Sequence, residues 1–397
     1  MMYAPETIAF PYVDNEGRPL RTRQENTQAL LDAHRATVRY NAMTHGLELR
    51  FGGLEVNAAR VNGTSLAWLR TLARRHGLSA NNVCEDLPTC ADEYHPALEW
   101  IDDAAWDGVD RIETLIDTVD TADTMAPELI RSWLLQCAAA LVQDKGFRPE
   151  GVLTFQGPQG CGKTQWVRSL GSATAPEGII LIGRSIDPSN RDSIQQATSS
   201  WICEIGEVDG TFRKSDIAAL KAFLDLDYDI YRAAYAREAE RRPRRTSFFA
   251  SVNRPDFLAD TTGNRRWWSV NVQSCNWKHS IDTRQLWAQC VHLVRAGVRW
   301  RLTEDQHDAL KDSNKRFEVL SPIAEELWSR WTAAADGRVR LGEICDAMGY
   351  APGTSSYNRI AREVAQLLVT AGVSKTRIRT ADGKRPTVFG LRRCSPD

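Results

Sequence analysis

The eight residues GPQGCGKT, numbers 157–164, constrain the fold of this chain more than any other feature. They match the pattern G-x-x-x-x-G-K-[S/T] in full. The short apolar run GVLTF precedes them and a segment compatible with a helix follows, which is the strand–loop–helix order that a phosphate-binding loop requires. The sequence therefore predicts a nucleotide-binding α/β unit here, in preference to a chance glycine-rich turn.

Each part of this loop has an expected task. Its glycines allow backbone N–H groups to turn inward around a triphosphate. Lys163 is expected to reach the β- and γ-phosphates, and the Thr164 hydroxyl is placed to bind Mg²⁺. We therefore expect ATP and Mg²⁺ as cofactors, with ATP held by Gly157, Pro158, Gln159, Gly160, Cys161, Gly162, Lys163 and Thr164.

Two further buried strands are predicted after the loop. SWICEIGE, residues 200–207, and TSFFASVN, residues 246–253, are apolar runs separated from each other and from the first strand by segments long enough for a helix. Strands spaced in this way indicate a mostly parallel sheet covered on both faces. The predicted fold class is α/β, with a P-loop NTPase core.

Hydrolysis needs more than a phosphate-binding loop. It needs a carboxylate to hold Mg²⁺ and a group that orients the attacking water. Glu204 and Glu207 can supply both, and we assign Glu204 to the metal and Glu207 to the water, although the roles could be exchanged. Two solvated surface carboxylates are the alternative. Asn253 ends the third strand, where an amide could sense the γ-phosphate or could simply end a strand.

Two adjacent arginines, Arg265 and Arg266, stand in the stretch TTGNRRWWSV. A guanidinium often stabilises the charge that develops on the γ-phosphate, and a neighbouring subunit often delivers it. One arginine could reach the nucleotide while the other holds the loop or the partner. The alternative is a basic turn that covers the start of a tryptophan-rich strand.

A series of segments between residues 92 and 320 resembles the virulence-associated E proteins of phages and mobile elements. These proteins are P-loop ATPases related to the superfamily 3 helicases of the AAA+ class. The segments, in chain order, are YHPALEWIDDAAWDGVDRIETL, FQGPQGCGKT, WICEIGEVDG, LKAFLDLDYDIYRAAYARE, FFASVNRPDFLADTTGNRRWWSV and RLTEDQHDALKDSN. The resemblance implies an NTP-driven, hexameric DNA motor that serves replication of a phage or integrated element.

The resemblance also implies a role for each site residue. Lys163 and Thr164 fall on Walker A, Glu204 and Glu207 on the Walker B segment, Asn253 on sensor 1, and Arg265 and Arg266 on the arginine-finger segment. The two acids are three positions apart, whereas typical superfamily 3 members have adjacent acids, so their roles stay open. The first 90 residues show no primase module, and we do not predict primer synthesis.

Two basic segments are candidates for DNA contact. Related helicases carry a DNA-gripping hairpin where this chain has DIYRAAYAREAERRPRRTS, and basic residues interleaved with aromatic ones suit a single-stranded phosphate track. A solvated loop or a subunit interface is the alternative. The candidates in this segment are Arg232, Arg237, Arg241, Arg242, Arg244 and Arg245.

The last 60 residues give the second basic segment, in the order helix, helix, hairpin that is typical of a winged helix-turn-helix. The hairpin suggests duplex contact through phosphates, with the second helix as a groove reader, although such a domain can also bind protein. The candidates here are Lys375, Arg377, Arg379, Lys384 and Arg385.

Length and composition set the remaining limits. A chain of 397 residues suggests two or three domains. We predict an accessory module at 1–90, a helical region at 91–150, the ATPase core at 151–280, a helical lid or linker at 281–335 and a winged-helix-like domain at 336–397. The net charge of −1 means that any nucleic acid must be bound by local patches. Because no signal peptide or membrane span is legible, we expect a cytoplasmic protein.

The favoured interpretation is a ring-forming, ATP-dependent DNA helicase or translocase that acts on single-stranded or forked DNA and works with other replication proteins. One alternative is an origin-binding initiator or helicase loader that does not unwind processively. A second alternative is a nucleic-acid-binding regulator that binds nucleotide without hydrolysing it.

The loop lysine gives the first testable prediction. Lys163→Ala should abolish nucleotide use, because the substitution removes the ammonium that is expected to contact the β- and γ-phosphates. Steady-state ATPase activity and equilibrium ATP binding measure the effect. Unchanged turnover in this variant would contradict the assignment of the loop.

Overall fold

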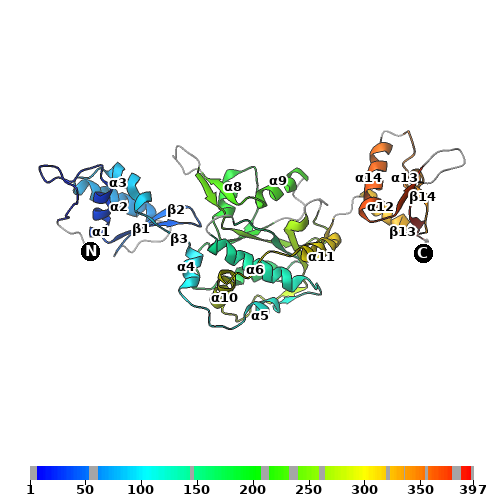
Figure 1. The fold of residues 1–397 in the computed structure, drawn as a ribbon, viewed down its shortest axis with the longest axis horizontal. Helices are drawn as coiled ribbons and strands as arrows, with labels where there is room; N and C mark the ends of the chain where they lie inside the picture. The colour runs from blue at the N-terminus through cyan, green and yellow to red at the C-terminus, as the bar shows by residue number, and fades with distance from the viewer. Residues whose placement is uncertain are drawn as a thin grey trace. The chain divides into compact units, whose positions relative to one another are not determined.

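The computed structural model describes residues 7–52, 61–143, 147–206, 214–231, 240–258, 264–318, 322–334, 336–353, 356–377 and 386–394. The chain divides into two compact units (Figure 1). The first consists of Met1–Pro255 and Thr262–Lys315, and the second of Asp256–Thr261 and Arg316–Asp397.

The first unit opens with a small α/β module. Strand β1 pairs antiparallel with β2 and parallel with β3, and the helices supply leucines such as Leu30, Leu69 and Leu72 to a separate core. The elements are α1 (Gln24–Ala33), β1 (Ala36–Asn41), β2 (Gly46–Phe51), α2 (Val61–Arg75), α3 (Ala80–Asp86), the 3₁₀ turn η2 (Leu87–Cys90) and β3 (Asp92–Tyr94).

A helical region follows, as predicted. Its longest helix, α6, carries a proline in its first turn, where the backbone N–H would have no partner within the helix. The negative charge of Glu128 in the same turn interacts favourably with the positive end of the helix dipole. Trp133 of α6 is fully buried and donates its indole N–H to the carbonyl of Phe248. The elements are α4 (Pro96–Asp102), α5 (Ile112–Ile116), β4 (Val119–Asp120) and α6 (Ala126–Val142).

A five-stranded sheet forms the centre of the unit. Its order is β11-β5-β10-β7-β6 and every neighbouring pair is parallel, which confirms the predicted parallel sheet. The strands are β5 (Val152–Gln156), β6 (Ile180–Arg184), β7 (Ile202–Ile205), β10 (Ser247–Val252) and β11 (Trp267–Asn271). The edge strand β6 was not predicted, although its sequence starts with the short apolar run Ile180–Ile182; it is only partly buried.

The strand order indicates at which end of the sheet a ligand is expected. The chain leaves β5 through helix α7 and enters β6 at the far edge, whereas β10 and β11 flank β5 on either side. In open parallel sheets, ligands bind beyond the carboxyl ends of the strands where the strand order reverses. The glycine-rich loop lies at that point, between β5 and α7 (Lys163–Ser169).

Helices cover the sheet, and α6 and α10 lie together on one side of it in Figure 1. The remaining elements of the first unit are α8 (Arg191–Thr198), α9 (Lys214–Leu224), the hairpin strands β8 (Tyr228–Tyr231) and β9 (Glu240–Pro243), the 3₁₀ turn η3 (Asn264–Arg266), β12 (Ser274–Cys275), α10 (Thr283–Arg295) and α11 (Glu304–Asn314). β12 pairs antiparallel with β4.

The second unit has the predicted order of helices followed by a hairpin. Its elements are η4 (Lys315–Phe317), α12 (Pro322–Arg330), β13 (Trp331–Ala333), β14 (Val339–Arg340), α13 (Leu341–Ala347), α14 (Tyr357–Thr370), β15 (Lys375–Arg377), β16 (Thr387–Phe389) and β17 (Leu391–Arg393). Ile323 and Leu327 of α12 belong to the same core as α13 and α14. The segment predicted as a linker over 281–335 is therefore divided between the two units.

No helix in the described ranges is long and apolar enough to cross a membrane.

The start of β5 gives a prediction about stability. A Cβ at Gly151 would lie 2.2 Å from the ring of Trp268, which is fully buried and has no room to move. Gly151→Ala should therefore destabilise the protein by about 1–3 kcal/mol, the usual cost of overpacking. Gly63→Ala is the matched control. Gly63 lies in α2 with open space around it, so alanine there should be neutral or stabilising. Equal unfolding midpoints for Gly151→Ala and the wild type would contradict the packing argument.

Candidate functional site

The glycine-rich loop is shaped by its packing against the segment that follows β11. Gly162 has φ of +97° and a Cβ there would lie 2.6 Å from the carbonyl oxygen of Cys275. A Cβ at Gly157 would lie 2.2 Å from the carbonyl oxygen of Val272. Larger residues are therefore excluded at both positions, by close approach at Gly157 and also by backbone conformation at Gly162.

Lys163 is buried inside the loop. Its Nζ donates to the carbonyl oxygens of Gly157, at 2.7 Å, and Pro158, at 2.9 Å. It also donates to Oδ1 of Asn253, at 3.2 Å. The ammonium is therefore held at the mouth of the loop, beside the carboxyl ends of β5 and β10.

Glu204 lies at the next strand and is 2% exposed. Its Oε1 accepts a hydrogen bond of 2.8 Å from the Thr164 hydroxyl and another from the Ser251 hydroxyl, and its Oε2 accepts from the backbone N–H of Gly183 at 3.1 Å. A buried carboxylate is tolerated when its oxygens are hydrogen-bonded in this way. The hydrogen bond from Thr164, the second residue of α7, therefore joins that helix directly to β7.

Asn253 follows the last residue of β10 and completes the group. Its backbone carbonyl accepts from the Gln156 side chain at 3.3 Å, which holds the residue beside β5. The structure thus brings Lys163, Thr164, Glu204 and Asn253 together, although they are scattered over 90 residues of sequence. Glu207 lies outside the described residues.

Arg265 and Arg266 lie at the opposite end of the sheet. Trp267 pairs with Val152 and Asn271 with Gln156, so the arginines precede the amino end of β11 while the loop follows the carboxyl end of β5. Five residues of strand, roughly 16 Å, separate the two ends. Neither arginine can therefore reach the loop of the same chain.

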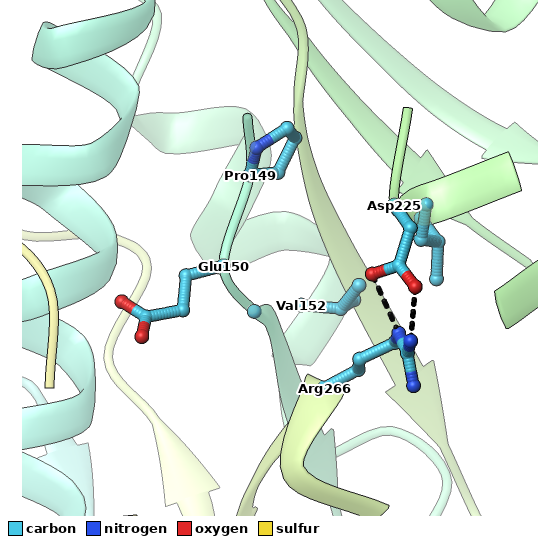
Figure 2. Close-up of a pocket in the computed structure, with 7 residues that line it drawn as sticks. Pro149, Glu150, Val152, Asp225 and Arg266 are labelled. Atoms are coloured by element: carbon cyan, nitrogen blue, oxygen red, sulfur yellow. Dashed lines mark hydrogen bonds and ion pairs between the residues drawn. The ribbon is translucent and has the colours of Figure 1, made fainter. Parts of the chain in front are cut away.

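The two arginines differ in their surroundings. Figure 2 shows the guanidinium of Arg266 facing the carboxylate of Asp225; Nε donates to Oδ1 at 2.8 Å and an Nη donates to Oδ2. Arg148 also contacts Asp225, at 3.1 Å. The hydrogen bond from Arg266 lowers the pKa of Asp225 below its ordinary value. Arg265, by contrast, is exposed and has no hydrogen-bond or ion-pair partner among the described residues.

Comparison with known proteins identifies the family. The model of the virulence-associated protein E-like domain matches residues 101–319, which is more than half of the chain. The chain belongs to the virulence-associated protein E-like family. No curated protein matches it.

One solved structure supports the fold of this family member. An A-form apo structure of the NrS-1 C-terminal region is 13% identical, with a TM-score of 0.51, and the match covers 92% of this chain and 98% of that one. A second A-form apo structure of the same region is 12% identical, with a TM-score of 0.48 and coverage of 92% and 99%. At these identities the likeness concerns the fold alone.

Two arginines of the first basic segment donate hydrogen bonds inside the protein, and the burial of Arg244 corrects its prediction as a DNA contact. Arg244 is 1% exposed, donates to the carbonyl of Phe223 at 2.6 Å and lies 4.3 Å from the centre of its ring. Arg245 donates to the carbonyls of Leu141 and Gln143 at the end of α6. The guanidinium of Arg244 adds a second donor to the Phe223 carbonyl, which also accepts from the N–H of Leu226, and that of Arg245 satisfies carbonyls at the end of α6.

The other candidate arginines of that segment differ in their exposure and contacts. Arg241 is exposed on β9 and its guanidinium lies 3.4 Å from the centre of the Tyr228 ring. Arg242 is half-buried and donates to the carbonyl of His45 in the N-terminal module. Arg232 and Arg237 lie outside the described residues.

The second unit presents basic and polar side chains to solvent. Lys375 and Arg377 are exposed on β15, while Arg379, Lys384 and Arg385 lie outside the described residues. Five described residues of α14 are exposed and recur at helical spacing on one face, and all but Val369 are polar or basic; they are Asn358, Arg359, Arg362, Gln366 and Val369. This face belongs to the second helix of the predicted helix-turn-helix.

Sequence reasoning missed Ser251 and Asp225. Ser251 could have been found, because it is two positions before Asn253 and residues two apart in a strand share a face. Asp225 has no comparable signal, since its link to Arg266 spans 41 positions.

The two kinds of arginine in the β8–β9 region can be separated experimentally. Arg244→Ala should destabilise the protein by about 2–5 kcal/mol, because it empties buried space beside Phe223 and removes a buried hydrogen bond to the Phe223 carbonyl. Arg241→Ala should change stability by less than about 0.5 kcal/mol, as is usual for exposed positions. Chemical denaturation of both variants tests this, and equal losses would contradict the assignment.

Proposed function

We propose that this protein is an ATP-dependent DNA helicase or translocase that forms a ring and serves replication of a phage or integrated element. The observation that carries the proposal is the meeting of Lys163, Thr164, Glu204 and Asn253 at the carboxyl edge of the sheet. The family resemblance supplies the biological setting. Binding of nucleotide alone would need the loop but not the buried glutamate and asparagine beside it, which argues against a non-hydrolysing regulator.

The first proposed step is capture of the triphosphate. The N–H groups of the loop and of the first turn of α7 face the phosphates, and Lys163 exchanges its loop carbonyl partners for β- and γ-phosphate oxygens. Asn253, which already contacts Lys163, is then beside the γ-phosphate and orients the attacking water. Glu207 remains the predicted second group for that water.

The donors beside the loop suit Mg²⁺. Thr164, Ser251 and Glu204 offer hydroxyl and carboxylate oxygens within hydrogen-bonding distance of one another, and Mg²⁺ prefers such hard ligands. No three His, Cys, Asp or Glu side chains of the described residues gather into a metal cage. Mg²⁺ does not require one, because it usually keeps several waters and binds one or two carboxylates together with the substrate phosphates. When bound, it neutralises charge on the β- and γ-phosphates.

Arg265 is the proposed finger, delivered to the loop of a neighbouring copy. It is exposed and unpartnered among the described residues, and it lies at the end of the sheet away from its own loop. Arg266 holds this turn in place through Asp225. This division of labour refines the sequence-based expectation, in which either arginine could take either role.

DNA contact is proposed at two places. The β8–β9 hairpin carries Arg241 stacked on Tyr228, a pair that can meet both the phosphates and the bases of a single strand. The exposed face of α14 carries Asn and Gln, which pair with adenine, and Arg, which pairs with guanine. That face favours the second candidate function, an initiator or helicase loader that recognises duplex DNA.

The shared-site arrangement gives a direct prediction. Arg265→Ala should bind ATP normally and lose turnover by roughly 10³-fold or more, the scale of arginine fingers. Lys163→Ala should also be inactive. Mixing the two variants should restore part of the ATPase activity. In a mixed assembly, the loop of an Arg265→Ala chain still has Lys163, and a neighbouring Lys163→Ala chain can supply Arg265 to it.

Arg266→Ala is the matched control. It should lower the unfolding midpoint, since it leaves Asp225 without its main partner. Full activity of Arg265→Ala on its own, or mixtures that stay inactive although both variants assemble, would overturn the proposal of a finger acting between subunits.

A further inference from the structure

The segment after β11 is fixed against the glycine-rich loop by backbone hydrogen bonds. The N–H of Cys275 donates to the carbonyl of Cys161 at 2.7 Å, and the N–H of Asn276 donates to the carbonyl of Thr118 at 2.8 Å. β12 in this segment also pairs with β4. The residue that follows, Trp277, is therefore placed by a rigid frame instead of a free loop.

Trp277 stands out among the tryptophans. Five others are fully buried, namely Trp133, Trp166, Trp201, Trp268 and Trp287. Trp277 is 39% exposed, and its Cδ1 lies 3.1 Å from the position of a Cβ on Gly162. A large aromatic ring thus lies on the loop itself, next to the residue that precedes Lys163.

The side chain of Lys278 adds a charge to this surface. Its Nζ lies 4.9 Å from the centre of the Trp277 ring, within the range of a cation–π contact. The exposed indole and ammonium together form a surface that suits a flat, electron-rich ring system attached to phosphates. Aromatic side chains bind nucleobases by stacking because every base has a π-face.

We propose that Trp277 is the stacking platform for the nucleobase of the nucleotide held by residues 157–164. The inference rests on the proposed function, because it assumes that the loop binds the phosphates. Lys163 and the start of α7 receive the phosphates, and the nucleoside extends past Gly162 to the indole. Trp277 therefore selects a nucleoside triphosphate over inorganic polyphosphate.

The test compares ligands with and without a base. Calorimetric titration of the full chain with ATP and with tripolyphosphate, both with Mg²⁺, gives the two dissociation constants. Trp277→Ala should weaken ATP binding by roughly 5- to 100-fold, the range for loss of one base–aromatic stack, and leave tripolyphosphate binding unchanged. Trp277→Phe should recover most of the ATP affinity. Tyr12→Ala, which removes another exposed aromatic ring, is the control and should change neither constant.

The possible failures are distinguishable. If the wild type binds neither ligand, the proposed nucleotide site fails. If the wild type binds both, but Trp277→Ala binds ATP as well as the wild type does, the stacking platform is wrong. Equal weakening of both ligands would show that Trp277 supports the loop and does not recognise the base, which also overturns the inference.

Discussion

The buried carboxylate of Glu204 is the interaction on which the rest of the candidate site depends. A charge that is 2% exposed requires hydrogen-bond donors around it, because its desolvation is otherwise prohibitive. The donors come from three elements: Thr164 from α7, Ser251 from β10 and Gly183 from β6. One side chain therefore fixes the glycine-rich loop relative to three strands, and it places an oxygen ligand where a metal-bound triphosphate would need one.

The parallel sheet imposes a second constraint. All five strands run in one direction, so the groups that follow strands and the groups that precede them lie at opposite ends. Lys163 and Asn253 follow strands β5 and β10, whereas Arg265 precedes strand β11. A single chain thus has the glycine-rich loop at one end of the sheet and the exposed guanidinium of Arg265 at the other, and it cannot bring the two together. The fold itself accounts for the proposal that activity requires a neighbouring copy.

The sequence predicted those parts of the structure whose signals are local. The loop, strands β5, β7 and β10, and the helix–helix–hairpin order of the last 60 residues follow from patterns within short segments. The roles of Arg244 and Arg245 could not be predicted in this way. A run of arginines has the same composition whether its donors point to solvent or to backbone carbonyls, and here the carbonyls of Phe223 and Leu141 lie 21 and 104 positions away.

The proposed catalytic site is tested most directly by the steady-state ATPase activity of the full chain, measured over a range of protein concentrations with and without single-stranded DNA. We expect hydrolysis that needs Mg²⁺, that rises per chain as the concentration favours assembly, and that single-stranded DNA stimulates. Hydrolysis without stimulation or strand separation would favour the initiator or loader. If there is no hydrolysis at any concentration, Lys163, Thr164, Glu204 and Asn253 do not form a catalytic site.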